Sequence, residues 1–336
     1  MNIISVIGTR PQYIKLKPVD AFCKENGIKH MSLDTNQHYS DSVSKDIKRD
    51  LGLDIDINLR DGAFARDEIE FISQVCSSFK NVLETESLRS DVFCLIYGDT
   101  NSSFAAALVC YKLNIPFAHV EAGARCFNNR VPEEVNRIFV DSSATINFCT
   151  SKNSLENIKG GILTGDLEYE LLKSMQLEGG SGNYSVMTIH RQSNMDAESL
   201  SNIFQFCKKL GKVVLPIHHR LRHNKVFANI DVPKNIEIID PLPFSEMAKL
   251  LSSCKNILSD SGGLLKTAPF FGKRLLSLRS HVGWTEVLEA DYARIATFSD
   301  DDISWLNGPV MPADKNFYTY GLRASQVIIE GVLNEC

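Results

Sequence analysis

The sequence predicts an α/β protein with two doubly wound parallel sheets. Short apolar runs typical of strands alternate with longer segments whose apolar residues recur at helical spacing. This alternation stops at a polar, glycine-rich stretch, residues 171–183, and then begins again. The chain of 336 residues is also longer than one compact core usually is. We therefore expect two Rossmann-like domains, residues 1–170 and 171–319, with a C-terminal helix at 320–336 that packs back on the first.

The strands are expected at apolar runs that end in polar or turn-forming residues. In the first half these runs are residues 2–7, 29–33, 92–97, 117–120 and 146–149. In the second half they are residues 185–189, 213–217, 236–239, 256–258, 274–278 and 294–297. Residues 54–62 are expected to form an irregular connection.

The helices are expected where apolar residues recur every three or four positions. In the first half they are predicted at residues 12–25, 41–51, 66–88 and 101–113, and from about Pro132 onward. In the second half they are predicted at residues 196–210, 244–253, from about Leu264, at 284–290 and at 320–333. Pro11 suits a helix start, where its missing N–H costs nothing, and Asp196 suits an N-cap.

Composition excludes several classes of protein. A net charge of −5 provides no basic face for nucleic acid, and no apolar run approaches the length of a membrane span. The nine cysteines are scattered without CxxC spacing, which favours buried thiols in a reducing compartment. No basic segment precedes the first strand, so no signal peptide is expected. We expect a cytoplasmic protein.

Three acids in the first half are candidates for acid–base chemistry. Asp99 and Glu121 follow two predicted strands, and Glu133 follows a proline at a predicted helix start. Ligands of open α/β sheets bind at the carboxyl ends of the strands, where such acids can transfer protons. Capping of strand ends and metal binding are the alternatives. No DxD pair follows a strand and most of the histidines lie in the other half, so a metal site is not expected.

Two turns are candidates for anion binding. Arg10 and Lys15 lie at the start of the first predicted helix, and a solvated basic helix face is the alternative reading. In the second half the tripeptide Ser261, Gly262 and Gly263 lies between a strand and a helix, where backbone N–H groups can approach a diphosphate. A plain strand–helix turn is the alternative there. Further donors follow other strands of that half: His190, Arg191, His218 and Arg279.

Polar strand ends in both halves favour a ligand cleft between two domains, which is the arrangement of nucleotide-sugar enzymes of the GT-B architecture. A series of motifs makes this more specific. They are GTRPQ at 8–12, TNQHYS at 35–40, YGDTNSS at 97–103, HVEAGARCFN at 119–128, PEEVNR at 132–137, TGD at 164–166, TIHR at 188–191, LPIHHR at 215–220, LSDSGG at 258–263 and FFGKRLLSLR at 270–279. From residue 1 to about Glu289, the chain resembles the non-hydrolysing UDP-N-acetylglucosamine 2-epimerases.

The resemblance implies a fold, a reaction and a set of residue roles. It implies a GT-B homodimer that uses no metal or nicotinamide cofactor and serves surface polysaccharide synthesis. UDP is eliminated across C1–C2 of a UDP-2-acetamido sugar and re-added after C2 is protonated on the opposite face. The matching catalytic positions are Asp99, Glu121, Glu133 and His190. The matching substrate and UDP-binding positions are Arg10, Lys15, His218, Ser261, Gly262, Gly263 and Arg279.

Four positions depart from the family pattern. Thr267 replaces a glutamate expected to hold the ribose hydroxyls, and Leu242 replaces a polar uridine contact. The motif around Trp284 is similar to that of a branch of the family in which some members act on UDP-diacetamido-glucuronic acid. Ser40 replaces a glutamine of the regulatory second UDP-N-acetylglucosamine site.

Three other functions stay open at this point: a hydrolysing 2-epimerase that releases UDP and free sugar, a GT-B glycosyltransferase, and a binding protein that has lost catalysis. Of the acidic pair 133–134, the sequence predicts Glu134 to be the more tolerant of substitution.

Overall fold

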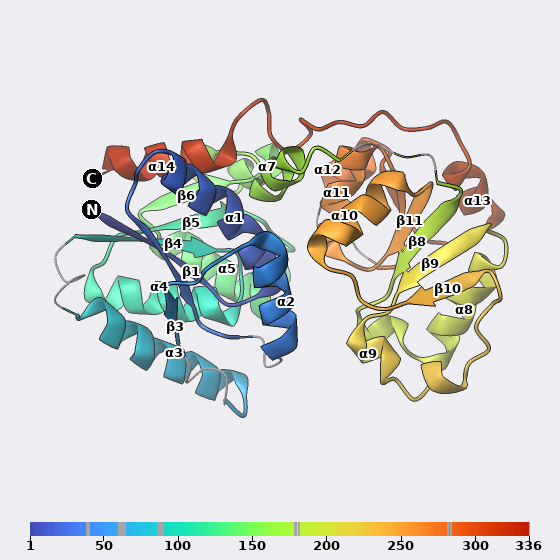
Figure 1. Ribbon diagram of the computed structural model, residues 1–336, viewed down its shortest axis with the longest axis horizontal. Helices are drawn as coiled ribbons and strands as arrows, with labels where there is room; N and C mark the ends of the chain where they lie inside the picture. The colour runs from blue at the N-terminus through green and yellow to red at the C-terminus, as the bar shows by residue number, and fades with distance from the viewer. Residues whose placement is uncertain are drawn as a thin grey trace. The chain divides into compact units, whose positions relative to one another are not determined.

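The computed structural model describes residues 1–37, 41–59, 65–85, 91–177, 180, 182–280, 282 and 284–335, without the side chains of 41–45. The chain divides into two compact units (Figure 1). The first unit is Met1–Met175 with Tyr318–Cys336, and the second is Gln176–Phe317. Each unit is a parallel sheet covered by helices, which is the α/β architecture that the alternating pattern predicts.

Within the described residues, the sheet of the first unit has seven strands in the order β3-β2-β1-β4-β5-β6-β7. All neighbouring strands of this sheet are parallel. The strands are β1 (Asn2–Ile7), β2 (His30–Asp34), β3 (Ile57–Asn58), β4 (Val92–Tyr97), β5 (Phe117–Ala122), β6 (Ile146–Cys149) and β7 (Ile162–Leu163).

The helices of this unit lie on both faces of its sheet. They are α1 (Arg10–Glu25), α2 (Asp41–Leu51), α3 (Glu68–Leu83), α4 (Asn101–Leu113), α5 (Pro132–Ser143), α6 (Lys152–Glu156), α7 (Leu167–Ser174) and α14 (Ala324–Glu335). Helices α3, α4 and α5 pack side by side, whereas α1 packs against α7 and the C-terminal α14. A continuous apolar core joins the strands to α3 and α4, with Ile4, Cys94, Phe79 and Ala106 among its fully buried members.

The second unit holds a parallel sheet of six described strands in the order β10-β9-β8-β11-β12-β13. Its strands are β8 (Tyr184–Thr188), β9 (Lys212–Pro216), β10 (Ile236–Ile239), β11 (Asn256–Ser259), β12 (Arg274–Ser277) and β13 (Ala293–Ile295). Its helices are α8 (Ala197–Cys207), α9 (His219–Arg222), α10 (Phe244–Ser253), α11 (Gly262–Phe271), α12 (Thr285–Glu289) and α13 (Asp300–Leu306), and two 3₁₀ turns are η2 (Gln192–Asn194) and η3 (Phe227–Asn229).

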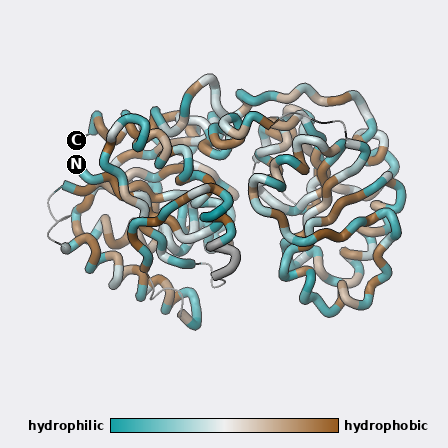
Figure 2. The backbone as a smooth tube through the Cα atoms, in the orientation of Figure 1, coloured by the Kyte–Doolittle hydropathy of each residue, from teal (hydrophilic) through white to brown (hydrophobic). Residues whose placement is uncertain are grey.

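Hydrophobic residues concentrate along the strands of both units, and hydrophilic residues along the loops and outer helix surfaces (Figure 2). None of the helices in the described ranges is long and apolar enough to cross a membrane. The cysteines of these ranges are all free thiols, and those on the strands are buried.

In each sheet the strand order reverses at one point, between β1 and β4 and between β8 and β11. Ligands of doubly wound sheets bind outside the carboxyl ends of the strands at such points. Gly8 and Asp99 follow β1 and β4, whereas His190 and Asp260 follow β8 and β11. The topology therefore brings predicted site residues of each half to its own switch point.

The structure corrects several predicted elements. Residues 54–62 are not wholly irregular, because β3 pairs with β2 there. Strand β5 continues to Ala122, so Glu121 lies inside a strand rather than after it. Residues 171–174 end helix α7 instead of beginning a linker, and the last helix begins at Ala324 rather than 320. Short elements such as α6, β7, α9 and α13 have no sequence periodicity of their own and depend on their neighbours.

Candidate active site

The turn after β4 places Asp99 at the carboxyl end of the first sheet. Gly98 takes a φ of 63°, which a residue with a side chain rarely adopts, and Thr100 caps helix α4 by accepting from the N–H of Ser103. The Asp99 carboxylate forms an ion pair with the guanidinium of Arg137, on helix α5. Asn136, the preceding residue, donates to the Asp99 carbonyl oxygen at 3.0 Å. Helix α5 therefore holds both the side chain and the backbone of Asp99.

Glu121 lies in a β-bulge on the neighbouring strand. The register between β5 and β6 shifts between Val120 and Ala122, and Glu121 is the extra residue, with a φ of 75°. Its carboxylate forms an ion pair with the ammonium of Lys15 on α1. A Cβ atom built on Gly98 would lie 3.4 Å from Glu121 Oε2, so the carboxylate lies over the turn that carries Asp99. A non-glycine residue with a positive φ lowers the stability of the fold by roughly 1–3 kcal/mol, and such residues are typical of functional sites.

The two acids at the start of α5 have different surroundings. Glu133 is exposed, whereas Glu134 is 1% exposed. Glu134 accepts from the backbone N–H groups of Cys126 at 3.0 Å and Phe127 at 2.9 Å. Burial alone would raise the pKa of Glu134, but these hydrogen bonds and the charge of Arg137 lower it. Glu134 therefore fixes the loop after β5, a structural role that its place in the sequence does not reveal.

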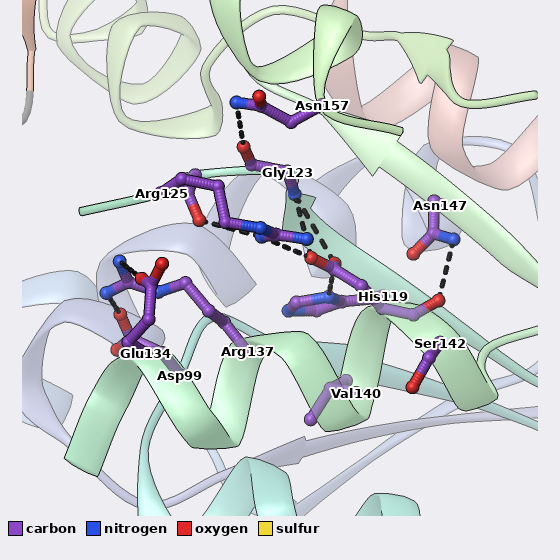
Figure 3. Close-up of polar contacts among 12 residues, drawn as sticks. Asp99, His119, Gly123, Arg125, Glu134, Arg137, Val140, Ser142, Asn147 and Asn157 are labelled. Atoms are coloured by element: carbon purple, nitrogen blue, oxygen red, sulfur yellow. Dashed lines mark hydrogen bonds and ion pairs between the residues drawn. The ribbon is translucent and has the colours of Figure 1, made fainter. Parts of the chain in front are cut away.

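Arg137 links the carboxylates of Asp99 and Glu134 (Figure 3). One of its terminal nitrogens pairs with Asp99, and the other donates to Glu134 Oε2 at 2.9 Å. Because Glu134 is itself tied to the loop at 126–127, the position of the Asp99 carboxylate depends on a chain of contacts through α5.

A buried cluster beneath these turns was not predicted from the sequence. His119 on β5 lies 2.6 Å through Nδ1 from Asp141 Oδ1 and 2.9 Å through Nε2 from the carbonyl oxygen of Gly98. Asp141 also pairs with Arg125 at 2.6 Å and accepts from the N–H of Gly123. Burial would raise the pKa of Asp141, but His119 and Arg125 lower it. The cluster ties the ends of β4 and β5 to α5 (Figure 3). A histidine inside an apolar strand is the one sequence signal for it.

The turn after β1 is built around Gly8 and Gln12. Gln12 Oε1 accepts from the N–H of Gly8 at 2.8 Å, and its Nε2 donates to the Tyr97 carbonyl oxygen at 2.7 Å. A Cβ atom on Gly8 would lie 2.1 Å from Thr35 Oγ1 and 2.3 Å from Ser102 Oγ, so only glycine fits. The turns after β1, β2 and β4 thus interlock around this glycine.

Arg10 and Lys15 both lie on α1, and Lys15 pairs with Glu121. Burial lowers the pKa of Arg10, whereas the charges of Asp50 and Glu168 raise it. The structure of this unit thus brings Asp99, Glu121 and Lys15 together. Glu133 is exposed in the first turn of α5.

In the second unit, His190 lies against Asp260 at the switch point. Asp260 is 1% exposed, and its carboxylate accepts from the backbone N–H groups of His190 and Arg191, each at 2.9 Å. The Nδ1 atom of His190 lies 3.2 Å from Asp260 Oδ1. The ring of His218 lies edge-on to that of His190, with centroids 4.9 Å apart. Asp260 directly precedes the predicted diphosphate turn and was not predicted as a site residue.

The tripeptide Ser261, Gly262 and Gly263 forms the N-terminus of α11, a position that both an anion-binding turn and a plain strand–helix turn would occupy. A Cβ atom on Gly262 would lie 3.3 Å from a terminal nitrogen of Arg279, which follows β12. The guanidinium therefore lies over the start of the helix. A pocket of about 330 Å³ adjoins it, and its lining includes Arg191, Asn194, Arg279 and Phe298.

Two of the positions that depart from the family pattern, Thr267 and Trp284, lie on or near α11. Thr267 is buried, and its hydroxyl donates to the carbonyl oxygen of Leu264 at 3.1 Å, a contact within the helix. The ammonium of Lys266 lies 4.9 Å from the ring centroid of Trp284. Ser40 lies outside the described residues. No group of His, Cys, Asp and Glu side chains in the described ranges is arranged to hold a metal ion.

Comparison with known proteins matches this chain to one family. A family model described as UDP-N-acetylglucosamine 2-epimerase matches residues 20–306. The chain is 31% identical to a UDP-N-acetylglucosamine 2-epimerase homolog of Methanococcus maripaludis, over 99% of each chain. It is 30% identical to the UDP-2,3-diacetamido-2,3-dideoxy-D-glucuronate 2-epimerase of Pseudomonas aeruginosa, over 86% of each.

A solved structure supports the same assignment. The UDP-GlcNAc 2-epimerase of Neisseria meningitidis, crystallised with UDP-GlcNAc, superposes with a TM-score of 0.83 and 26% identity over 99% of this chain and 100% of that chain. This confirms the predicted fold class, two Rossmann-like parallel sheets of the GT-B type. The chain therefore belongs to the UDP-N-acetylglucosamine 2-epimerase family, a family of isomerases.

Proposed function

We propose that this protein inverts C2 of a UDP-2-acetamido sugar by eliminating and re-adding UDP, without net hydrolysis. The observation that carries the proposal is the pair of carboxylates at neighbouring strand ends, Asp99 and Glu121, each held by its own cation. Inversion at C2 requires one group that removes a proton from one face and another that returns a proton to the opposite face. Two separately oriented carboxylates meet this requirement.

The elimination can be written with atoms and charge balanced. A carboxylate takes the C2 proton, the C–H electron pair forms the C1=C2 bond, and the C1–O bond breaks, so that UDP leaves with the C1–O bonding pair. In re-addition a second acid protonates C2 on the other face, the C1=C2 electron pair forms this C–H bond, and a UDP oxygen supplies the electron pair of the new C1–O bond. We assign the two proton transfers to Asp99 and Glu121 jointly, with Glu133 as a third acid.

The charge that develops on the departing UDP needs stabilisation, for which we propose the second unit. Ser261, Gly262 and Gly263 offer backbone N–H groups at the positive end of α11, and Arg279 lies over Gly262. His190 and His218 stand nearby and, in the imidazolium form, would donate a proton to a phosphate oxygen. Arg10 and Lys15 are proposed as substrate contacts in the first unit, where Lys15 would also hold Glu121.

The substrate is proposed to be a UDP-2-acetamido sugar that is either UDP-N-acetylglucosamine or a diacetamido uronate. The uronate is supported by the Pseudomonas aeruginosa relative and by Trp284, which matches the branch of the family in which some members act on UDP-diacetamido-glucuronic acid. UDP-N-acetylglucosamine is supported by the names of the other relatives. We also propose a homodimer that serves surface polysaccharide synthesis, as the family resemblance implies.

Turnover in deuterated water tests the proposal directly. The protein is incubated with UDP-N-acetylglucosamine and, separately, with UDP-2,3-diacetamido-2,3-dideoxyglucuronic acid, and products are followed by NMR. One substrate should gain deuterium at C2 and yield its manno epimer while UDP stays attached. Accumulation of free UDP and free sugar would indicate the hydrolysing reaction instead. No deuterium at C2 in either sugar would contradict the proposal.

A further inference from the structure

The carboxylate of Asp260 is surrounded by hydrogen-bond donors only. Its Oδ1 atom accepts from the His190 N–H at 2.9 Å, and its Oδ2 atom accepts from the Arg191 N–H at 2.9 Å and from Asn194 Nδ2 at 2.9 Å. Burial alone would raise the pKa of Asp260, but its contacts with His190, Arg191 and Asn194 lower it. The group is therefore an ionised carboxylate, which can only accept hydrogen bonds.

The Asp260 carboxylate determines which ring nitrogen of His190 carries the proton. The imidazole Nδ1 atom lies 3.2 Å from Asp260 Oδ1, so a neutral His190 must carry its proton on Nδ1 to make a favourable contact. The lone pair then lies on Nε2. The side chain of His190 is 36% exposed, so part of the ring is accessible to a ligand.

We propose that Asp260 is a positioning residue that fixes His190 in the Nδ1–H tautomer and so makes Nε2 the atom that exchanges a proton with the substrate. The inference rests on the proposed function, in which His190 serves the departing UDP. Asp260 lies between β11 and Ser261, so one buried carboxylate holds the histidine and begins the diphosphate turn. The orientation of His190 is thereby coupled to the position of the bound phosphates.

Other groups around His190 do not determine its tautomer. The ring of His218 lies edge-on at 4.9 Å between centroids, and the ring of His219 is tilted against that of His218, with centroids 4.2 Å apart. Arg191 is exposed on the adjoining turn. Among the hydrogen bonds of the described residues, the contact of the His190 ring is with Asp260.

The substitution Asp260→Asn offers a sharp test because it keeps the shape and changes one acceptor into a donor. Both carboxylate oxygens face N–H groups, so the introduced amide NH₂ must meet a donor on either side. This conflict is partly relieved when the amide donates to Nδ1 of His190, which moves the imidazole proton to Nε2, while the His190 backbone N–H keeps the remaining oxygen as an acceptor. The matched control is Asn194→Ala, which removes another donor to Asp260 and leaves the contact with His190.

The measurement is long-range ¹H–¹⁵N NMR of the full chain labelled with [¹⁵N]histidine, with His190→Gln used to assign the signal. Spectra are recorded at about pH 8.5, where an ordinary histidine with a pKa of about 6.5 is neutral. The unsubstituted protein and Asn194→Ala should both show a protonated Nδ1 and an unprotonated Nε2. Asp260→Asn should show the reverse.

Turnover supplies a second readout. Loss of the correct histidine tautomer costs about 10⁴-fold in a well-studied hydrolase, so we expect Asp260→Asn to lower kcat by about 100-fold or more and KM by much less. A protonated Nε2 in the unsubstituted protein would overturn the inference, even if Asp260→Asn does not fold. An unchanged tautomer in a folded Asp260→Asn protein would also overturn it. Should the unsubstituted protein epimerise no UDP-sugar, the proposed function fails, and the NMR spectra still decide whether Asp260 sets the tautomer.

Discussion

Asp99 and Glu121 differ from ordinary surface acids because each is paired with a cation on a different helix. Asp99→Asn and Glu121→Gln keep the side-chain shape but remove the ability to accept the C2 proton. We expect each substitution to lower kcat by at least about 100-fold, the usual contribution of a positioned acid or base. Epimerisation of the UDP-sugar measures this effect.

The exposed pair of Lys80 and Glu84 supplies the control. Glu84→Gln removes an acid of similar chemistry from the surface and should leave kcat unchanged. Asp99→Asn or Glu121→Gln protein with kcat within a few fold of normal would remove that residue from the proton transfers. Thermal melting of all three proteins separates a chemical effect from unfolding.

Substitution of Glu134 should affect mainly the stability of the protein, whereas substitution of its neighbour Glu133 should affect mainly kcat. Glu134→Gln replaces a buried, ionised acceptor and should lower the free energy of unfolding by about 1–3 kcal/mol. Glu133→Gln changes an exposed carboxylate, so stability should stay within about 0.5 kcal/mol of normal while kcat falls. Urea denaturation and turnover assays separate the two. Full activity of Glu133→Gln would show that Glu133 is not catalytic.

For single residues, the sequence predicts the acidic site residues better than it predicts the residues with which they pair. An acid that follows an apolar run is visible along the chain, and Asp99 is the clearest example. Its partner Arg137 lies 38 positions away, and Asp260 lies 70 positions from His190. Such pairs exist only after parallel strands have brought distant segments to one edge of a sheet. Hydrophobic periodicity contains no information about them.

Among the elements, the loop after β5 is the most tightly constrained. Gly123 has a φ of 80°, and a Cβ atom there would lie 2.1 Å from the carbonyl oxygen of Ser154. Gly123→Ala therefore adds a backbone collision to an unfavourable φ. We expect a loss of more than about 3 kcal/mol in the free energy of unfolding, which exceeds the roughly 1–2 kcal/mol of the φ alone.

Gly160 isolates the conformational part of this effect. Its φ is 76°, and a Cβ atom there would meet nothing within 4 Å. Gly160→Ala should therefore cost only about 1–2 kcal/mol in urea denaturation. Equal losses for the two alanine variants would mean that the contact with Ser154 is not a constraint.

The periodic helix Asp41–Leu51 and the alanine-rich helix Asn101–Leu113 are both predicted almost to the residue. The extension of β5 through Glu121 was not predicted, because a bulge with a positive φ at a glutamate has no sequence signature. It is also the irregularity that directs this carboxylate toward Lys15. A strained site residue is where local pattern and tertiary structure are expected to disagree.

For the whole molecule, buried acids predict how stability depends on pH. The folded-state pKa values of Glu134, Asp141 and Asp260 all lie below the ordinary values of 4.5 for Glu and 3.8 for Asp. A depressed pKa contributes stability above the unfolded-state pKa, and this contribution is lost as pH falls through the folded-state pKa. The free energy of unfolding should therefore be constant near neutral pH and fall steadily below about pH 4.5.

Chemical denaturation between pH 7 and pH 3 measures this dependence. Glu134→Gln protein should start from a lower stability and lose less of it on acidification, because one of the three groups no longer titrates. Stability that does not change down to pH 3 would mean that these carboxylates are not preferentially ionised in the folded state.

The C-terminal helix completes the first unit rather than the second. Helix α14 places Ile328, Ile329 and Val332 in the core, and the segment before it holds Asp166 through the Tyr318 carbonyl oxygen at 2.8 Å. Arg323 then bridges Glu25 at 2.7 Å and Glu170 at 3.2 Å. The first unit is thus formed from both ends of the chain.

This arrangement reverses the usual order of assembly on the ribosome. Domains generally fold as their residues emerge, with the N-terminal one first. Here the second unit is continuous in sequence, from Gln176 to Phe317, while the first needs α14, which follows the whole second unit. Strand β1 and helix α1 precede the second unit, so they gain their full set of partners only after its residues have been made. Until then, the surface of α1 that α14 covers lacks its partner.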